Sequence, residues 1–416
     1  MADSAKPRWA WALYDAGNSA FATVVMAGFF PLLFKTYWSA GADVTLSTAQ
    51  LGMANAGAGL AIALLAPVLG AVADRGGTRK RFLAVFTGIG TAGTAALVLV
   101  EKGCWPYAAA LYVAGVIGFS GANIFYDALL PSITDKTNIH RTSALGYSLG
   151  YLGGGLLFAL CVVMMLSPGS LGLVQAGAQN LSFIFTALWW GVFTIPLMLY
   201  VTEPGAPGPG GYALAVSEGL RQLRATFRAI RKMKTAWLFL LAYWFYIDGV
   251  NTIIRMAIDY GLSLGFSSRD LIVALLITQF VGFPSALVFG RLGERWGVKK
   301  ALYTGIAGYL VIVVWGVCMR DKTEFYILAV LVGLFQGGIQ ALSRSYYSRL
   351  IPRQHAAQFF GFYNMVGKFS AILGPALVGL SAYVSKSPRA GIASIALFFI
   401  IGGVLLSRVG ETTKKS

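Results

Sequence analysis

The stretch GAVADRGGTRKR, at residues 70–81, decides the fold because it returns in altered form as GRLGERWGVKK at residues 290–300. Two further pairs of stretches keep the same order along the chain. DAGNSAF at residues 15–21 parallels DGVNTII at 248–254, and HRTSALGYSLGY at 140–151 parallels HAAQFFGFYNMVG at 355–367. Each pair alone is weak. Three landmarks in one order indicate that the second half of the chain repeats the first.

The composition places both halves in a lipid bilayer. Of the 416 residues, 57% are hydrophobic and 12% are charged, and the mean hydropathy is +0.68. Soluble domains contain roughly 45–50% apolar and about 25% charged residues. The 51 glycines agree with this interpretation, because small residues let neighbouring helices approach closely in lipid.

Apolar windows of about 20 residues, long enough to span a bilayer, occur six times before residue 202 and six times after residue 235. We therefore predict an all-α membrane protein with twelve transmembrane helices in two pseudo-symmetric six-helix bundles, residues 1–202 and 235–416. Residues 203–234 form the predicted linker, which begins with EPGAPGPGG and continues as a basic amphipathic helix on the inner membrane surface. A parallel repeat with a site between its halves is typical of transporters that alternate access by rocking.

Lysine and arginine gather in alternate loops, and this pattern sets the orientation by the positive-inside rule. Both termini are predicted to lie in the cytoplasm, with the chain in the inner (plasma) membrane of a bacterium. The net charge of +17 then reflects anionic lipid on the inner leaflet. Nucleic acid is not an expected partner, because the basic residues are spread over many segments. The chain is expected to be a monomer.

Few residues are suited to metal or covalent chemistry. The cysteines, Cys104, Cys161 and Cys318, are scattered, and the two histidines, His140 and His355, are far apart in the sequence. No metal, disulfide or cofactor is therefore expected. An integral-membrane enzyme acting on lipid-linked substrates, the alternative class of function, would need a catalytic cluster such as Ser/His or His/Asp at a membrane surface. We find no such cluster at motif spacing and no nucleotide-binding G-x-x-x-x-G-K-[ST] loop, so we predict that the chain is not an enzyme and that gradients supply its energy.

The repeated loop resembles a known motif. GAVADRGGTRKR is similar to the loop between the second and third helices of the major facilitator superfamily, and GRLGERWGVKK resembles its echo in the second half. The residues that carry the resemblance are Gly70, Asp74, Arg75, Arg79 and Lys80 in the first half and Gly290, Glu294 and Arg295 in the second. More narrowly, ALYDAGNSAFATVVMAGFFP, GFSGANIFYDALLP and FFGFYNMVGKFSAILGP resemble the branch called unknown major facilitators, which is related to autophagy-linked vacuolar amino-acid effluxers. The resemblance implies the twelve-helix fold and secondary transport, with amino-acid efflux as one possible activity.

The loop motif is interpreted as a gate. Gly70 permits close contact between neighbouring helices, Asp74 can face the positive end of a nearby helix, and the basic residues hold the inner surface. Contacts of this kind form in one conformation and break in the other. The alternative, a loop that is merely positive-inside, accounts for the basic residues but not for Gly70 and Asp74.

Charged residues inside the predicted spans are the candidates for function. A charged residue at a helix centre costs on the order of 2.5–3.5 kcal/mol on insertion scales, so Asp15 and Asp127 are expected to face the interior. Asp15 is the leading candidate for a proton-coupling site, Asp127 its nearest rival, and Asn18 a companion. The alternative is that these acids are helix-end residues bonded to Asn18, Tyr126 or neighbouring backbone.

The second half supplies the predicted substrate site. Arg255 and Lys368 are the basic residues that fall inside predicted spans, and the others, Arg344 among them, are placed in loops or at helix ends. At 1.5 Å per residue, Asp248 and Lys368 both reach mid-depth. We predict that Lys368 binds the anionic group of the substrate, and the alternative is a permanent ion pair with Asp248. The predicted polar companions of Lys368 and Asp248 are Asn251, Tyr363 and Asn364.

The predicted function is secondary active transport of a small solute by alternating access, coupled to protons. An amino acid competes with an organic anion, a lipid or an amphiphilic drug as substrate, and the sequence does not choose between them.

Overall fold

The computed structural model describes residues 5–41, 50–51, 53–55, 57–62, 65–66, 69–70, 78–135, 138–172, 175–203 and 227–410. These residues are almost entirely helical, and no strand occurs among them. Ten of their helices are long and apolar enough to cross a membrane. The described residues also contain α13 (Ala356–Ser385), which is 30 residues long, and the short apolar helix Met53–Ile62. The prediction of an all-α, twelve-helix membrane protein is confirmed.

The first half begins with one long helical segment. It comprises α1 (Ala5–Ala20), the π-helix η1 (Phe21–Phe29), α2 (Phe30–Leu33) and the π-helix η2 (Phe34–Trp38). The elements that follow are α4 (Arg79–Ala96) with the short η3 (Leu97–Leu99), α5 (Trp105–Ile133), α6 (Ile139–Leu166), η4 (Pro168–Leu171) and α7 (Gln175–Tyr200).

The second half has the same plan. Its elements are α9 (Lys234–Ser263), α10 (Ser268–Arg295), α11 (Val298–Cys318), α12 (Lys322–Leu350), η5 (Arg353–His355) and α13, followed by α14 (Pro388–Ser394) and α15 (Ala396–Ser407). Two helix starts are capped by side chains. Ser267 and Asp270 form a reciprocal capping box at α10, and the Asp321 carboxylate accepts hydrogen bonds from the backbone of Thr323 and Glu324 at α12.

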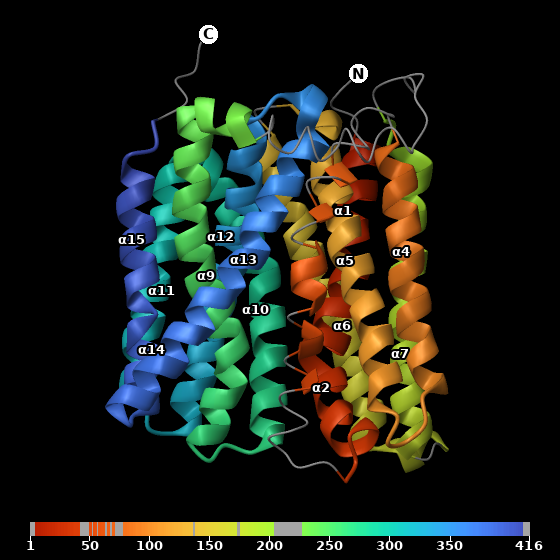
Figure 1. Ribbon diagram of the computed structural model, residues 1–416. Helices are drawn as coiled ribbons and strands as arrows, with labels where there is room; N and C mark the ends of the chain where they lie inside the picture. Colours follow the sequence, from red (N-terminus) through yellow and green to blue (C-terminus); the bar gives the residue numbers. More distant parts are fainter. Residues whose placement is uncertain are drawn as a thin grey trace.

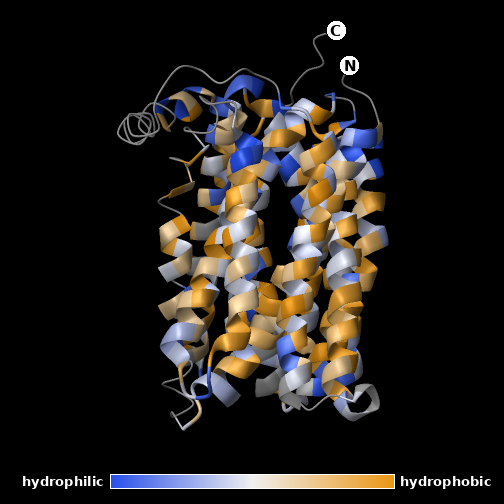
Figure 2. Ribbon diagram, turned by 90° about the vertical axis from the view of Figure 1, so that its right-hand side faces the viewer, coloured by the Kyte–Doolittle hydropathy of each residue, from blue (hydrophilic) through white to orange (hydrophobic). Residues whose placement is uncertain are grey.

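The helices stand side by side in two groups (Figure 1). The helices α1, α4, α5, α6 and α7 form one group, and α9 to α15 form the other, with α6 packed against α10 and α12 between the groups. The helix α1 begins, and α15 ends, at the same end of the molecule, which we call the terminal end. Hydrophilic residues gather at this end, whereas apolar residues dominate the middle (Figure 2).

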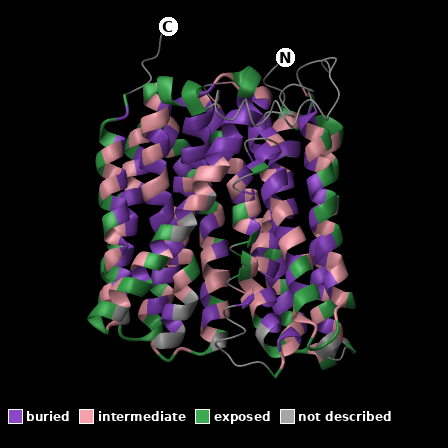
Figure 3. Ribbon diagram, viewed as in Figure 1, coloured by how far each residue is buried: buried purple, intermediate pink, exposed green. Residues whose placement is uncertain are grey.

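Burial is greatest between the two groups toward the terminal end (Figure 3). On the periphery, large apolar side chains are exposed, for example Leu99 at 79%, Leu199 at 67% and Val314 at 64%. Such surfaces are rare on soluble monomers and natural against lipid. The structure therefore has a lipid-facing belt and an interior that is closed at the terminal end by contacts between the two halves.

Candidate functional site: a charge cluster between the halves

The central feature of the terminal end is Arg344, which projects from α12 of the second half into the first half. Its side chain is 3% exposed. Nη1 lies 3.2 Å from Asp127 Oδ1 on α5 and 3.7 Å from Asp15 Oδ2 on α1. On α6, Nε donates to Ser143 Oγ at 2.9 Å and Nη2 donates to the Ser143 carbonyl at 2.8 Å. One guanidinium thus joins three helices of the opposite half.

Both carboxylates have further partners. Tyr126 Oη donates to Asp15 Oδ2 at 3.2 Å, and Ser19 Oγ donates to Asp15 Oδ1 at 3.2 Å. Asn364, from α13 of the second half, donates to Asp127 Oδ2 at 3.3 Å. Asp15 and Asp127 are only 6% and 7% exposed, so hydrogen bonds replace much of the water that these groups lose on burial.

Aromatic rings enclose the guanidinium. The Arg344 Cζ atom lies 4.3 Å from the ring centroid of Tyr147, 4.9 Å from that of Trp11 and 5.3 Å from that of Tyr126. Trp11 and Tyr126 are themselves stacked, with centroids 4.2 Å apart. Aromatic faces attract cations, more strongly where water is excluded. We call Asp15, Asp127, Trp11, Tyr126 and Tyr147 the cage; all five belong to the first half.

Arg344, Asp15 and Asp127 form what we call the charge cluster, and their charges do not balance. If both carboxylates are ionised, two negative charges face one guanidinium in surroundings of low dielectric constant. An uncompensated buried charge is costly, so the cluster favours the uptake of one further positive charge, such as a proton. This imbalance is the chemical property from which the functional argument starts.

A second layer of contacts between the halves lies closer to the terminal end and involves His140 of α6. Arg349 of α12 donates to His140 Nε2 at 3.1 Å. Because arginine can only donate, the ring is neutral and carries its proton on Nδ1, which donates to Ser345 Oγ at 2.8 Å. The Ser143 hydroxyl also donates to the Ala341 carbonyl at 2.8 Å, so α6 and α12 are joined over several turns.

The loop motif of the first half meets the second half at the terminal end. A Cβ atom on Gly70 would overlap the backbone carbonyl of Ala357 in α13. The Arg79 guanidinium donates to the carbonyls of Arg353 and Gln354 at 3.5 and 3.3 Å. Lys80 instead binds within its own half, where Nζ donates to the carbonyls of Met198 and Val201 at the end of α7.

The corresponding motif of the second half, residues 290–300, makes equivalent contacts with the first half. A Cβ on Gly290 would lie 2.5 Å from that of Ala144 in α6. Glu294 forms an ion pair with Arg141 of the first half at 2.5 Å. Lys299 Nζ donates to the carbonyl of Val409, just beyond α15, at 2.7 Å, as Lys80 does in its own half.

Three further residues belong to the predicted gate. Asp74 and Arg75 lie outside the described residues. Arg295 is exposed at the end of α10. The proposed gating role of the motif therefore depends on Gly70, Arg79, Gly290 and Glu294, each of which touches the opposite half.

Asp248 lies outside the charge cluster. It is fully buried on α9, and its Oδ1 accepts the backbone N–H of Gly374 in α13 at 2.9 Å and the Thr252 hydroxyl at 3.3 Å. Its Oδ2 has no hydrogen-bond partner among the described residues. The side chain of Lys368, its predicted partner, lies outside the described residues, although its backbone belongs to α13.

The other predicted substrate residues are dispersed. Asn251 donates to Ser370 Oγ at 3.4 Å, and Tyr363 is buried in a stack with Tyr243, centroids 4.3 Å apart. Asn364 joins Asp127 instead of a site around Lys368. Arg255 is exposed on α9.

The predicted companion of Asp15 also has a different contact. Asn18 is buried and donates to Asn123 Oδ1 at 2.7 Å. Ser19 and Tyr126 take the place beside Asp15 instead.

Sequence reasoning missed Arg344, which it placed at a helix end. The helix α12 continues to Leu350, so Arg344 lies within it and points into the other half. The available signal was the polar run SRSYYSR, residues 343–349, which an interior helical face would explain as well as a surface loop does.

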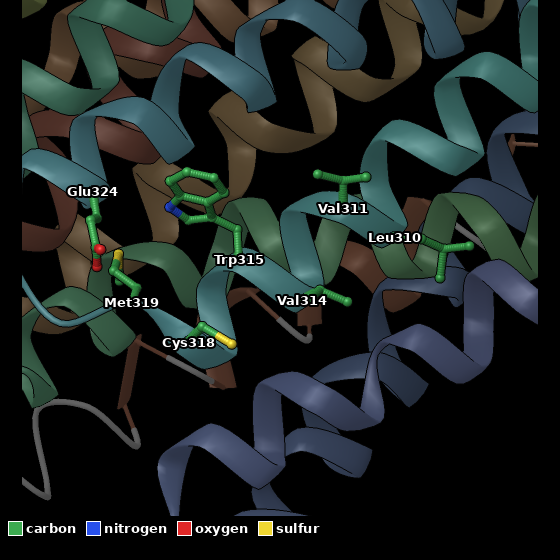
Figure 4. Close-up of a pocket in the computed structure, with 7 residues that line it drawn as sticks. All are labelled: Leu310, Val311, Val314, Trp315, Cys318, Met319 and Glu324. Carbon is green, nitrogen blue, oxygen red and sulfur yellow. The ribbon is translucent and has the colours of Figure 1, made fainter.

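A pocket at the outer side of α11 contains none of these groups (Figure 4). It is lined by Leu310, Val311, Val314, Trp315, Cys318 and Met319, with Glu324 of α12 at its edge. Val311 and Val314 are exposed to the periphery. Among the described residues no group of three or more His, Cys, Asp and Glu side chains is placed to hold a metal ion.

Sequence comparisons identify relatives along nearly the whole chain. The family described as "Vacuole effluxer Atg22 like" matches residues 53–143 and 135–416. An uncharacterised MFS-type transporter of Bacillus subtilis, YxiO, is 40% identical over 97% of this chain and 94% of its own length. Autophagy-related protein 22 of Yarrowia lipolytica is 28% identical over 61% of this chain, but the matched part is only 47% of that protein. The chain thus matches about half the length of this fungal relative.

Solved structures with the same fold are also transporters. The human organic anion transporter MFSD10 superposes with a TM-score of 0.75 over 97% of this chain and all of its own, at 13% identity. The proton:xylose symporter XylE superposes with a TM-score of 0.72 over 98% of this chain and 96% of its own, also at 13% identity. The expectation that the chain is not an enzyme is confirmed by these relatives. The chain is an integral membrane protein of the major facilitator type and belongs to the Atg22-like vacuole effluxer family.

Proposed function

We propose that this protein is a proton-coupled secondary transporter of amino acids or similar small zwitterions, and that Asp15 and Asp127 carry the proton. The observation on which the proposal depends is the charge cluster, in which two buried carboxylates of one half share a single guanidinium of the other. Efflux is suggested by the family, whose description names vacuole effluxers, and amino acids are the substrate class that the sequence resemblance implies.

The cluster links proton binding to movement of the halves. While the terminal end is closed, Arg344 offsets one of the two negative charges. Opening this end would separate Arg344 from the cage and leave two neighbouring carboxylates without their cation, and the repulsion between them makes the uptake of at least one proton favourable. A cycle in which a proton enters as Arg344 leaves would couple transport to the proton gradient.

The terminal end is proposed to face the cytoplasm of the plasma membrane, with both chain ends inside. The basic loops support this orientation through the positive-inside rule, and the anionic inner leaflet would bind them. The proposed division at residues 202 and 235 and the monomeric state belong to the same proposal. Labelling of introduced cysteines in intact cells tests the orientation, since reaction with an impermeant reagent at position 228 or 231 would contradict it.

Lys368 is proposed to bind the carboxylate of the substrate, near Asp248 and Asn251. Its position on α13 at mid-depth and the Gly-rich character of that helix support the role. Lys368→Ala and Lys368→Gln should lose substrate binding while the protein remains folded, and Asp248→Asn combined with Lys368→Gln should not restore it. Full transport by the double variant would show that the two residues form a structural pair.

The coupling proposal is tested in proteoliposomes with an imposed proton gradient and a panel of amino acids, organic acids and an amphiphilic cation. Accumulation of one substrate and alkalinisation or acidification of the lumen are measured together. Asp15→Asn should abolish accumulation against a gradient but leave exchange of internal for external substrate partly intact. Glu101→Gln, which changes an exposed loop acid, is the matched control and should behave like the parent.

The panel also discriminates between the functions. Accumulation of an organic acid or an amphiphile, with no amino acid transported, would replace the proposed substrate class. Accumulation and proton movement by Asp15→Asn and by Asp127→Asn at the parental level would show that neither carboxylate carries the proton.

A further inference from the structure

The cage already holds a cation, and that cation comes from the other half of the protein. Every group that surrounds the Arg344 guanidinium within the cage belongs to α1, α5 or α6. Carboxylates at 3.2 and 3.7 Å and three aromatic faces within 5.3 Å form the surroundings typical of a binding site for an organic cation.

The backbone is also shaped to leave room there. Gly146 of α6 forms one wall, and a Cβ at this position would lie 2.7 Å from Tyr126 Oη and 3.1 Å from Arg344 Nη2. The absence of a side chain at position 146 therefore keeps the space that the guanidinium fills.

We propose that the cage is the binding site for the ammonium group of the substrate, and that Arg344 acts as an internal stand-in that fills it while the terminal end is closed. The inference rests on the proposed function and adds to it a second pole of the substrate: the cage would take the ammonium group, as Lys368 is proposed to take the carboxylate. It also assigns Trp11, Tyr126 and Tyr147 as contacts of the substrate.

Competition follows from this arrangement. Arg344 and a substrate ammonium cannot occupy the cage together, so substrate binds only when Arg344 has left. The apparent dissociation constant is then the intrinsic constant divided by the fraction of molecules with an empty cage. Removal of the internal competitor should tighten the binding of a cation that needs nothing else from the protein.

The probes for this test are alaninamide, which has an ammonium group and no carboxylate, and propionate, which has a carboxylate and no ammonium group. Binding to purified protein in nanodiscs is followed through tryptophan fluorescence, because Trp11 lies in the cage. Arg344→Gln should bind alaninamide about tenfold more tightly or better, if the cage of the parent is filled at least nine-tenths of the time. Propionate binding should not change.

Arg349→Gln is the matched control. Arg349 is another arginine of α12 that contacts the first half, through His140, but it lies outside the cage. Its removal therefore loosens the interface and leaves Arg344 in the cage. Its affinity for alaninamide should rise far less than that of Arg344→Gln. Addition of Asp127→Asn to Arg344→Gln should abolish the gain.

A second measurement covers the case in which Arg344→Gln folds poorly. Arg344→Ala leaves a space the size of a guanidinium group. Low millimolar methylguanidinium should raise the Tm of this variant but not that of Arg349→Ala or of Arg344→Ala combined with Asp127→Asn.

The inference is overturned if Arg344→Gln or Arg344→Ala loses propionate binding instead, which would make Arg344 a receptor for the carboxylate. It is also overturned if neither probe distinguishes the Arg344 variants from the Arg349 variants. Binding is measured without a gradient, so failure of proton coupling would leave these outcomes unaffected.

Discussion

Neutralising Asp15 should change the stability of the protein little, whereas neutralising both carboxylates of the charge cluster should destabilise it strongly. At an effective dielectric constant of about 20, the attraction of Arg344 is about 5 kcal/mol for Asp127 at 3.2 Å and about 4.5 kcal/mol for Asp15 at 3.7 Å. Both distances end on the same nitrogen, so the two carboxylate oxygens are at most about 7 Å apart and repel each other by about 2 kcal/mol or more.

These opposing contributions predict a sequence of effects on the free energy of unfolding. Asp15→Asn loses the weaker attraction but also the repulsion and the cost of burying a charge, so it should change stability by less than about 1 kcal/mol. Asp127→Asn also loses the charge in the direct hydrogen bond to Nη1 and should cost about 1–3 kcal/mol. The double variant leaves Arg344 buried without an anion and should cost about 3–5 kcal/mol.

The measurement is unfolding by denaturant in mixed micelles, followed by tryptophan fluorescence, for the parent, the two single variants and the double variant. The double variant should cost at least about 1 kcal/mol more than the sum of the single variants. Asp248→Asn is the control, because its carboxylate contacts Thr252 and Gly374 instead, so its effect should add to that of Asp15→Asn. Simple additivity of the Asp15 and Asp127 changes would refute the view that the two share one cation.

Other contacts at the terminal end predict smaller or different effects. Gly290→Val should clash with Ala144 and shift the population toward an open terminal end, measured as faster labelling of a cysteine introduced nearby; unchanged labelling would contradict a gating role for this contact. Arg141→Ala breaks an ion pair whose arginine side chain is 62% exposed, so the free energy of unfolding should fall by less than about 1 kcal/mol. Lys80→Met leaves the last carbonyls of α7 without their cation and should lower stability by about 1 kcal/mol, and a loss confined to transport would contradict a structural role.

The sequence predicted the fold well because lipid imposes simple rules on helices. Among the apolar windows of the sequence, the one near residues 82–100 predicts the helix that the structure has as α4 at Arg79–Ala96, and the one near 301–319 predicts α11 at Val298–Cys318. The repeat was visible because the glycines and charges of both loop motifs make equivalent contacts. Neither inference needs knowledge of how the halves meet.

The candidate site was less predictable because its members come from both halves. The cost of a buried carboxylate singled out Asp15 and Asp127, but no pattern along the chain could pair them with Arg344, more than two hundred residues away. Hydropathy also ends a span at its first polar run, and this rule placed Arg344 outside the membrane. Asn364 was assigned to Lys368 as a neighbour on its own helix, whereas in space it bonds to Asp127 of the other half.

The two glycine contacts at the terminal end restrict how this end can open. Gly70 touches α13 and Gly290 touches α6, so the same kind of contact occurs twice, once on each side of the pseudo-twofold axis that relates the halves. A hinge that ran through one contact would part the other and leave the first intact. Release of both at once requires an axis of rotation that passes through neither of them. A hinge that passes through either contact is therefore incompatible with the release of both, and a tilt that lifts both contacts together satisfies it.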